Sequence, residues 1–115
     1  MAAALGQDHE VGLRPRVPAG ASAVILSGFY EGLEVSLDRE RTVVGRGRKA
    51  DVTLAEATIS RAHAVLGFDG EGFFVEDLGS TNGTMVNGTR VARQQFERDD
   101  EIQMGKLRIG IELPD

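Results

Sequence analysis

The sequence predicts an all-β domain folded as an antiparallel β-sandwich, with its functional loops clustered at one end. From residue 23 onward, short segments rich in Val, Ile, Leu and Phe alternate with turns that contain Gly, Asn and Asp. This pattern is typical of many short strands, and no segment shows the sustained apolar spacing of a long helix. Because the loops of a sandwich gather at its ends, segments far apart in the sequence can share one site.

Eight short apolar segments bounded by turn residues are predicted as strands: 23–26, 33–37, 42–45, 51–54, 63–68, 73–77, 101–104 and 107–113. In the last of these, apolar residues alternate with Arg108, Gly110 and Glu112. This alternation indicates a strand with one buried face. We expect it to be the long strand that closes the sandwich.

Three dipeptides mark tight turns between these segments. They are Asp69-Gly70, Asn82-Gly83 and Asn87-Gly88. Each contains residues that tolerate a positive φ, which tight hairpin turns require. The sequence therefore predicts hairpins at these places.

The chain has one predicted domain. Residues 1–21 mix Ala, Gly, Pro and charged residues without a period and are predicted to form a flexible N-terminal tail. Residues 22–115 form the domain, because 115 residues with 41% apolar content support a single core. The first residues resemble neither a signal peptide nor a membrane span, so we expect a cytoplasmic protein without a membrane partner.

The composition argues against several classes of function. The chain has no cysteine and only two histidines, so we expect no disulfide, no metal site and no cofactor. A net charge of -5 argues against a nucleic-acid partner, which normally requires a basic excess. Residues 39–61, however, hold six basic and three acidic residues. Such a small basic area suits one compact anion, although ordinary solvated surface charge would give the same count.

Three polar loops, each flanked by apolar strand-like segments, carry the candidate functional residues. Residues 45–49 read GRGRK, residues 60–63 read SRAH and residues 80–84 read STNGT. Together they supply fixed positive charge, hydroxyl groups and an amide on a tight turn. These are the groups that a phosphorylated side chain and its backbone require.

The first two loops supply groups suited to an anion. Arg46 offers a planar fork of donors that can bind phosphate oxygens in a bidentate way, although a surface arginine in a salt bridge is the alternative. Gly45 and Gly47 would permit unusual dihedral angles or a close approach of the backbone. Ser60 can donate its hydroxyl to phosphate, and Arg61 adds a second cation.

The third loop supplies further polar groups. Thr81 could reach the phosphate through its hydroxyl or its backbone N–H, whereas the Asn82 amide can both donate to and accept from a peptide backbone. Gly83 and Thr84 are expected to shape the turn. Asn87-Gly88 serves the next hairpin, and a contact between Asn87 and a peptide remains open.

Ser60 and His63 could also indicate a hydrolase that uses a serine nucleophile and a histidine base. Three residues apart in an extended chain, the two side chains are expected on opposite faces. The sequence also has no Gly-x-Ser-x-Gly elbow around Ser60 and no evident acid to orient His63. We therefore predict that the protein is not an enzyme.

The ordered set of motifs resembles the forkhead-associated (FHA) domain. The resemblance is carried by residues 45–46, 60–63, 81–84 and 87–88, and it extends from about residue 23 to residue 113. It implies a β-sandwich that recognises phosphothreonine in partner proteins without catalysing a reaction.

The resemblance also implies roles for individual residues. It makes Ser60 and its neighbour Arg61 phosphate ligands, and it gives His63 a structural task beneath the loops. It further implies a small apolar pocket for the threonine γ-methyl group.

We therefore predict a phosphothreonine-dependent interaction module of Ser/Thr kinase signalling. Its predicted phosphopeptide-binding residues are Arg46, Ser60, Arg61, Thr81 and Asn82, and its predicted supporting residues are Gly45, His63, Gly83, Asn87 and Gly88. Residues 1–21 contain no threonine, so we expect the partner to be another phosphoprotein, such as a Ser/Thr kinase or its substrate. The alternative is a phospho-independent assembly or self-association domain, and the sequence predicts no oligomeric state.

Overall fold

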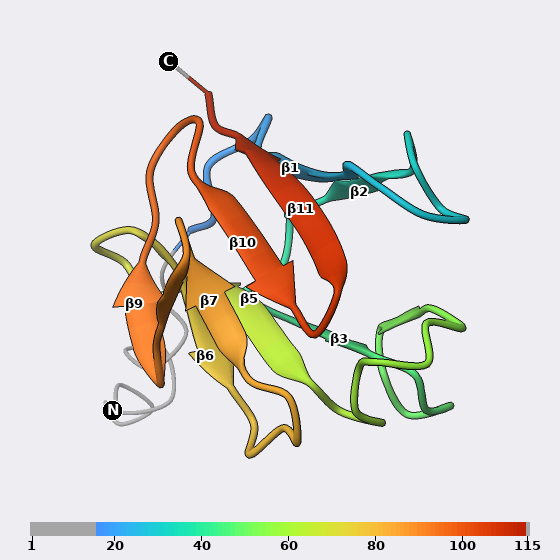
Figure 1. Cartoon of the computed structure of the whole chain (residues 1–115). Coiled ribbons are helices and arrows are strands. Elements are labelled where there is room, and N and C mark those ends of the chain that lie inside the picture. Colours follow the sequence, from blue (N-terminus) through green and yellow to red (C-terminus); the bar gives the residue numbers. More distant parts are fainter. Residues whose placement is uncertain (1–15, 115) are drawn as a thin grey trace, which may run out of the picture.

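The computed structural model describes residues 16–114, and within this range it contains strands and no helix (Figure 1). It has eleven strands: β1 (Ser22–Ile25), β2 (Glu34–Ser36), β3 (Arg41–Gly45), β4 (Val52–Thr53), β5 (Ala64–Phe68), β6 (Phe73–Asp77), β7 (Thr84–Val86), β8 (Thr89–Arg90), β9 (Arg93–Gln95), β10 (Glu101–Met104) and β11 (Leu107–Glu112). The prediction of an all-β domain is confirmed. Accordingly, no helix among the described residues is long and apolar enough to cross a membrane.

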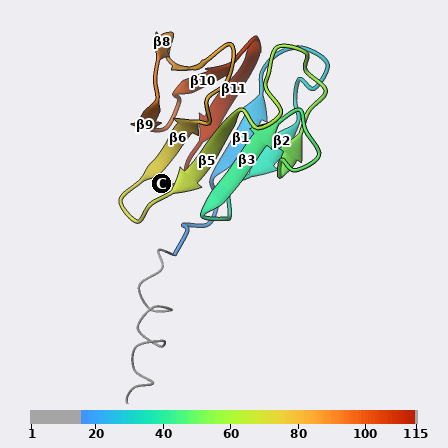
Figure 2. The ribbon, with the colours of Figure 1, turned by 90° about the horizontal axis from the view of Figure 1, so that it is seen from below.

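The strands form two sheets packed as a sandwich. One sheet has the order β2-β1-β11-β10-β7-β8, and the other has the order β4-β3-β5-β6-β9. Figure 2 shows β3, β5 and β6 in one layer and β1, β10 and β11 in the other. The recorded pairings are antiparallel except that of β4, a two-residue edge strand that runs parallel to β3. The predicted antiparallel sandwich is therefore confirmed, with one parallel pair at an edge.

The core lies between the two sheets. On β11, the alternation seen in the sequence is realised, because Leu107, Ile109 and Ile111 are buried whereas Arg108 and Glu112 are exposed. Burying each such aliphatic side chain contributes about 1.5–3 kcal/mol. The core thus holds together strands that are distant in the sequence.

Three strands were not predicted as such. β7, β8 and β9 have two or three residues each, and every residue of β8 and β9 is exposed. β9 exists because its backbone pairs with β6, with Gln94 opposite Val75. A short strand whose side chains are all exposed leaves no apolar pattern to detect.

Two of the predicted turns close hairpins directly. Asn87 and Gly88 have φ values of 49° and 86° and join β7 to β8, as a tight hairpin turn requires. Gly70, with a φ of 95°, lies in the turn between β5 and β6. Asn82-Gly83 differs, because it lies within the longer connection between β6 and β7.

The predicted tail, residues 1–21, falls mainly outside the described residues, as does Asp115. The described end of the predicted tail contacts the domain. Val17 packs against the core, Ala21 is buried, and the Ala21 carbonyl accepts the N–H of Leu37 at 2.9 Å.

Strand register brings three connections to one end of the sandwich. Ala64, at the start of β5, pairs with Val44 near the end of β3 and with Asp77 at the end of β6. The loops that follow β3, precede β5 and follow β6 therefore begin beside one another, in the lower part of Figure 1.

Candidate functional site

The candidate site is formed by the β3–β4, β4–β5 and β6–β7 loops, which contain the three polar motifs of the sequence. The first two loops are joined through their backbones. The Arg46 N–H donates to the Ser60 carbonyl at 2.9 Å, and the Gly47 N–H donates to the Arg61 carbonyl at 3.0 Å. The two loops therefore lie side by side as one surface.

Gly45 is required by this close approach. A Cβ atom at Gly45 would lie 2.0 Å from the Arg61 carbonyl oxygen, and one at Gly47 would lie 3.0 Å from the Arg61 Cβ. Neither glycine has a positive φ. Of the two reasons predicted for these glycines, close approach is confirmed, whereas unusual dihedral angles are not needed.

Ser60 connects the third loop to the other two. Its Oγ accepts the Thr81 backbone N–H at 3.1 Å, so the hydroxyl proton remains able to donate outward. The same bond uses the Thr81 N–H inside the protein. Of the two predicted ways for Thr81 to reach a phosphate, the hydroxyl is the one that remains.

Arg46 is oriented by a bond at one end of its guanidinium group. Its Nε donates to the Ile59 carbonyl at 3.0 Å, which leaves the two terminal nitrogens as donors on an exposed side chain. No ion pair is recorded for Arg46 or Arg61 within residues 16–114. The salt-bridged alternative for Arg46 is therefore not found in the described part of the chain.

Asn82 has one end of its amide engaged. Its Nδ2 donates to the Thr58 carbonyl at 2.8 Å, so its Oδ1 remains as an acceptor. Thr58 was not predicted as part of the site. Its hydroxyl donates to Glu56 at 2.6 Å and accepts the Lys106 N–H at 2.8 Å, which attaches the loops to the β10–β11 turn.

The bonds from Thr58 also affect Glu56. The hydroxyl and the backbone N–H of Thr58 both donate to the Glu56 carboxylate and lower its pKa below its usual value. The charged form is the one that holds Thr58 in place.

His63 supports the loops from beneath and is completely buried. Its Nδ1 accepts the Ser60 N–H at 3.0 Å, and its Nε2 lies 2.9 Å from the Gly83 carbonyl. Since Nδ1 accepts, the proton must be on Nε2, which donates to Gly83. The imidazole thus spans two loops, as the resemblance implied.

The premise that residues 60–63 form an extended chain is wrong. The chain turns at residues 61–62 instead of staying extended, and this brings the imidazole against the Ser60 backbone. Both ring nitrogens bond to backbone groups. The imidazole therefore has no free nitrogen with which to take the proton of the Ser60 hydroxyl.

Asp77 organises the third loop and was not predicted. Its Oδ1 accepts the hydroxyls of Ser80 and Thr84, at 2.5 and 2.7 Å, and its Oδ2 accepts the N–H groups of Gly79 and Ser80. Burial acts to raise the pKa of Asp77, but these hydrogen bonds outweigh it, and the pKa is lowered.

The remaining supporting residues lie at different places. Gly83 has a φ of 88° and donates its N–H to the Ser80 hydroxyl, which shapes the β6–β7 loop. The Asn87 amide bonds to the Asp100 carboxylate and to the Glu101 N–H, both at 2.9 Å. Asn87 thus holds β10 in place through both ends of its amide, and a contact between Asn87 and a peptide stays a prediction.

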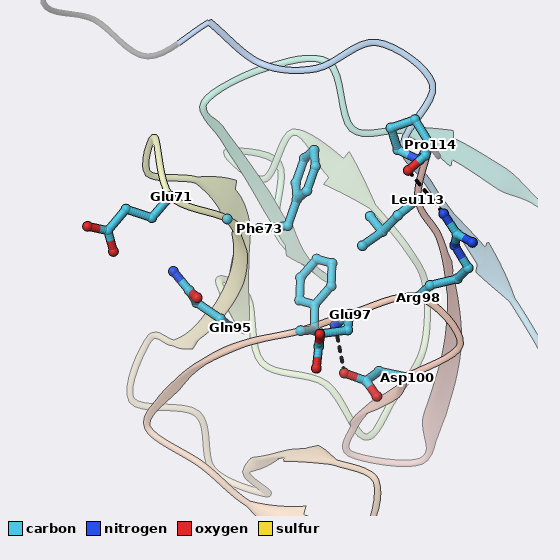
Figure 3. A pocket seen from close by; sticks show the side chains of 10 residues that line it. Glu71, Phe73, Gln95, Glu97, Arg98, Asp100, Leu113 and Pro114 are labelled. Carbon is cyan, nitrogen blue, oxygen red and sulfur yellow. Dashed lines mark hydrogen bonds between the residues drawn. The ribbon is translucent and has the colours of Figure 1, made fainter.

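A second surface depression lies at the opposite end of the sandwich (Figure 3). Phe73 and Phe96 stack there with ring centroids 6.1 Å apart. The depression is otherwise lined by Glu71, Gly72, Gln95, Glu97, Arg98, Asp100, Leu113 and Pro114. Three carboxylates against one guanidinium do not suit an anion, so this depression does not compete with the loop site.

Within residues 16–114, no group of three or more His, Asp or Glu residues could hold a metal ion.

Comparison with known proteins identifies the family. The model of the FHA domain matches residues 42–105, which include all three loops. The chain belongs to the FHA domain family.

The curated relatives of this FHA domain include a regulator and an enzyme inhibitor. It is 35% identical over 108 residues to the glycogen accumulation regulator GarA of Mycolicibacterium smegmatis, covering 93% of this chain and 68% of GarA. It is 37% identical over 94 residues to the oxoglutarate dehydrogenase inhibitor of Corynebacterium glutamicum, covering 81% of this chain and 66% of that protein. The chain thus spans about two thirds of these relatives.

Solved structures show the same fold. An FHA domain from work on phosphothreonine-dependent FHA interactions matches with a TM-score of 0.75 and 29% identity, covering 83% of this chain and 97% of that one. The FhaA FHA domain, solved with the intracellular domain of Rv3910, matches with a TM-score of 0.73 and 30% identity, covering 81% of this chain and 100% of that one.

Replacing Gly45 by alanine should destabilise the domain by about 2–3 kcal/mol, because the added methyl group overlaps the Arg61 carbonyl and forces two loops apart. Urea denaturation measures the change. Gly72→Ala is the matched control, since its Cβ would meet only the flexible Gln95 side chain at 3.3 Å. Equal unfolding free energies for the Gly45→Ala variant and the wild type would contradict this assignment.

Asp77 should make the domain sensitive to acid. The pKa of Asp77 is lowered in the folded state, so its ionised carboxylate adds to the free energy of unfolding. This stabilisation is fully present above the unfolded pKa of about 3.9 and is lost as pH falls through the folded pKa. Asp77→Asn should lower the free energy of unfolding at pH 7 by about 1–3 kcal/mol and flatten the decline below about pH 4.

Thermal unfolding across pH 2–7 tests the role of Asp77. Asp38→Asn serves as the control, because Asp38 is exposed. An unchanged pH profile in Asp77→Asn would show that the Asp77 carboxylate does not hold the loop.

Proposed function

We propose that this FHA domain binds phosphothreonine in partner proteins through the β3–β4, β4–β5 and β6–β7 loops. The observation that carries the proposal is the junction at Ser60, where the three loops are joined by the Ser60 carbonyl, which accepts from Arg46, and the Ser60 hydroxyl, which accepts from Thr81. This junction leaves several donors on one exposed surface.

These donors complement a phosphate group. A phosphothreonine carries a charge of about -1.5 to -2 at pH 7 and offers three strong acceptor oxygens. The terminal nitrogens of Arg46 and the hydroxyl of Ser60 would bind these oxygens, with Arg61 and the Thr81 hydroxyl completing the set. Charge-assisted bonds of this kind are roughly twice as strong as neutral ones.

The peptide backbone would be bound by Asn82. Its Nδ2 is held by the Thr58 carbonyl, which fixes the orientation of the amide and presents Oδ1 to a backbone N–H of the ligand. This bond would set the direction of the peptide relative to the phosphate.

A pocket for the threonine γ-methyl group remains a prediction from family resemblance. Burying one such group is worth about 0.8 kcal/mol, or roughly a fourfold preference for threonine over serine. Strict selection of phosphothreonine over phosphoserine therefore also requires close packing around the methyl group.

The site would bind without catalysing a reaction. Hydrolysis would require a base able to activate water or Ser60, and the His63 nitrogens are both bonded to backbone groups. The bound phosphate would therefore stay intact.

The partner would be a phosphorylated protein of a Ser/Thr kinase pathway, either a kinase or its substrate. The regulatory character of GarA and of the oxoglutarate dehydrogenase inhibitor supports this assignment. The acidic net charge of -5 disfavours a nucleic-acid partner.

Binding should depend on both phosphate and Arg46. In isothermal titration, a phosphothreonine peptide should bind, and its unphosphorylated form should not. Arg46→Ala should weaken binding by about tenfold to a hundredfold, because bonds to charged groups contribute about 1.5–3 kcal/mol. Arg39→Ala is the matched control, since it removes the same charge from a side chain paired with Asp51 at 3.6 Å.

Equal affinity for the two forms of the peptide would refute the proposal. Partner binding that survives both Arg46→Ala and Ser60→Ala would instead support a phospho-independent assembly domain.

Affinity should also fall in acid. The second pKa of a phosphate monoester is about 6, and contacts with the dianion lower that pKa in the complex. The extra affinity for the phosphate dianion is thus present above about pH 6. It is lost as pH falls toward the second pKa of the bound phosphate. We expect several-fold weaker binding at pH 5 than at pH 7.5, measured by fluorescence anisotropy.

A non-titrating sulfothreonine peptide is the control for this pH series. If its affinity falls in parallel, the loss comes from the protein and not from protonation of the phosphate.

A further inference from the structure

The β1–β2 loop, residues 26–33, holds an aromatic side chain in solvent. Phe29 is 95% exposed, and its ring makes a T-shaped contact with the Tyr30 ring, with centroids 5.1 Å apart. Among the described residues it is by far the most exposed large apolar side chain. A single exposed apolar residue is ordinary, so exposure alone does not indicate a binding surface.

Backbone hydrogen bonds hold the loop that carries Phe29. The Glu31 N–H donates to Gly28, the Gly32 N–H to Ile25 and the Leu33 N–H to Tyr30, at 2.8–3.1 Å. Gly28 and Gly32 both have a positive φ, which allows the tight turns. The backbone therefore presents Phe29 outward in a defined conformation.

Tyr30 connects this loop to the phosphate site. Its hydroxyl accepts the Ala55 N–H at 2.9 Å, which joins the β1–β2 loop to the β4–β5 loop. The Tyr30 ring and Arg46 then line one depression, together with Thr53, Ala55 and Ala57. Tyr30, whose ring contacts that of Phe29, thus shares this depression with the guanidinium group assigned to the phosphate.

The lining of this depression has a definite chemistry. The short side chains of Ala55 and Ala57 are exposed, and they leave the face beside Tyr30 open. Apart from Arg46, the lining residues are uncharged. An aliphatic or aromatic side chain would gain contact area there, whereas a cationic one would lose hydration beside Arg46 without finding a partner.

We propose that Phe29 and Tyr30 form a second contact for the phosphorylated partner, which receives an apolar side chain of the segment that carries the phosphothreonine. This inference rests on the proposed function. The phosphate bound at Arg46 holds the segment in place, and the aromatic pair selects segments that carry an apolar residue within a few residues of the phosphothreonine. Aromatic anchors beside a charged contact commonly supply specificity in this way.

The test compares phosphothreonine peptides in which leucine replaces alanine at one position at a time, from four residues before the phosphothreonine to four after it. At one or two positions, leucine should tighten binding to the wild type by about tenfold. Phe29→Ser should abolish most of this gain and leave the affinity for the all-alanine phosphopeptide unchanged. Phe29→Leu, which keeps an apolar side chain, should retain part of the gain.

Leu26→Ser is the matched control, because Leu26 is also an exposed apolar residue but lines a different depression with Val24 and Gly110. It should keep the full preference for leucine. Phe29 is almost fully exposed, so its variants should unfold at the same temperature as the wild type.

Two results would overturn the inference and leave the proposed function intact. In the first, binding depends on phosphate but leucine improves it at no position, or improves it equally in Phe29→Ser. In the second, Phe29→Ser abolishes a concentration-dependent dimer and does not alter peptide preference, which would make Phe29 a contact between two copies of the chain. Loss of phosphate dependence itself would instead refute the proposed function.

Discussion

The loops of this FHA domain depend on one buried imidazole. His63 accepts a backbone N–H from the β4–β5 loop and donates to a backbone carbonyl of the β6–β7 loop. A rigid ring with a nitrogen toward each loop sets the spacing between them. Because the ring is fully buried, losing either bond would leave a polar group without a partner, at a cost of about 1–3 kcal/mol.

Internal hydrogen bonds around this imidazole decide which polar groups remain available. The carbonyls of Thr58, Ile59 and Ser60 each accept a bond from within the protein, and the Ser60 hydroxyl oxygen accepts from Thr81. The terminal nitrogens of Arg46 and the hydroxyl proton of Ser60 remain available as donors. A surface on which these backbone acceptors are bonded internally, while charged and hydroxyl donors remain, is suited to an anion.

The two ends of the sandwich consequently differ in chemistry. The loop end combines these donors with the aromatic residues of the β1–β2 loop, whereas the lining of the depression at the other end includes three carboxylates and two phenyl rings. A phosphate contact supplies electrostatic attraction that depends little on the surrounding sequence. Neighbouring apolar contacts would then distinguish one phosphorylated segment from another.

The sequence by itself determined the fold class, the long strands and the identity of the loops. Residues 64–68, 73–77 and 107–112 carry enough apolar residues in a strand pattern to be recognised locally, and glycine or asparagine marks the turns. The motifs around Arg46, Ser60 and Asn82 were recognisable because their residue types and order are specific. β9 could not be found in this way, since its residues are all exposed.

Only the tertiary structure decided how the loops fit together. Gly45 is needed because the Arg61 backbone passes over it, Thr58 is bonded to Lys106 across 48 positions, and Tyr30 reaches Ala55 across 25. These contacts are backbone and hydroxyl bonds between distant segments, and such bonds impose no local periodicity on the sequence. Local patterns can thus specify which residues a loop contains, whereas strand register specifies what they touch.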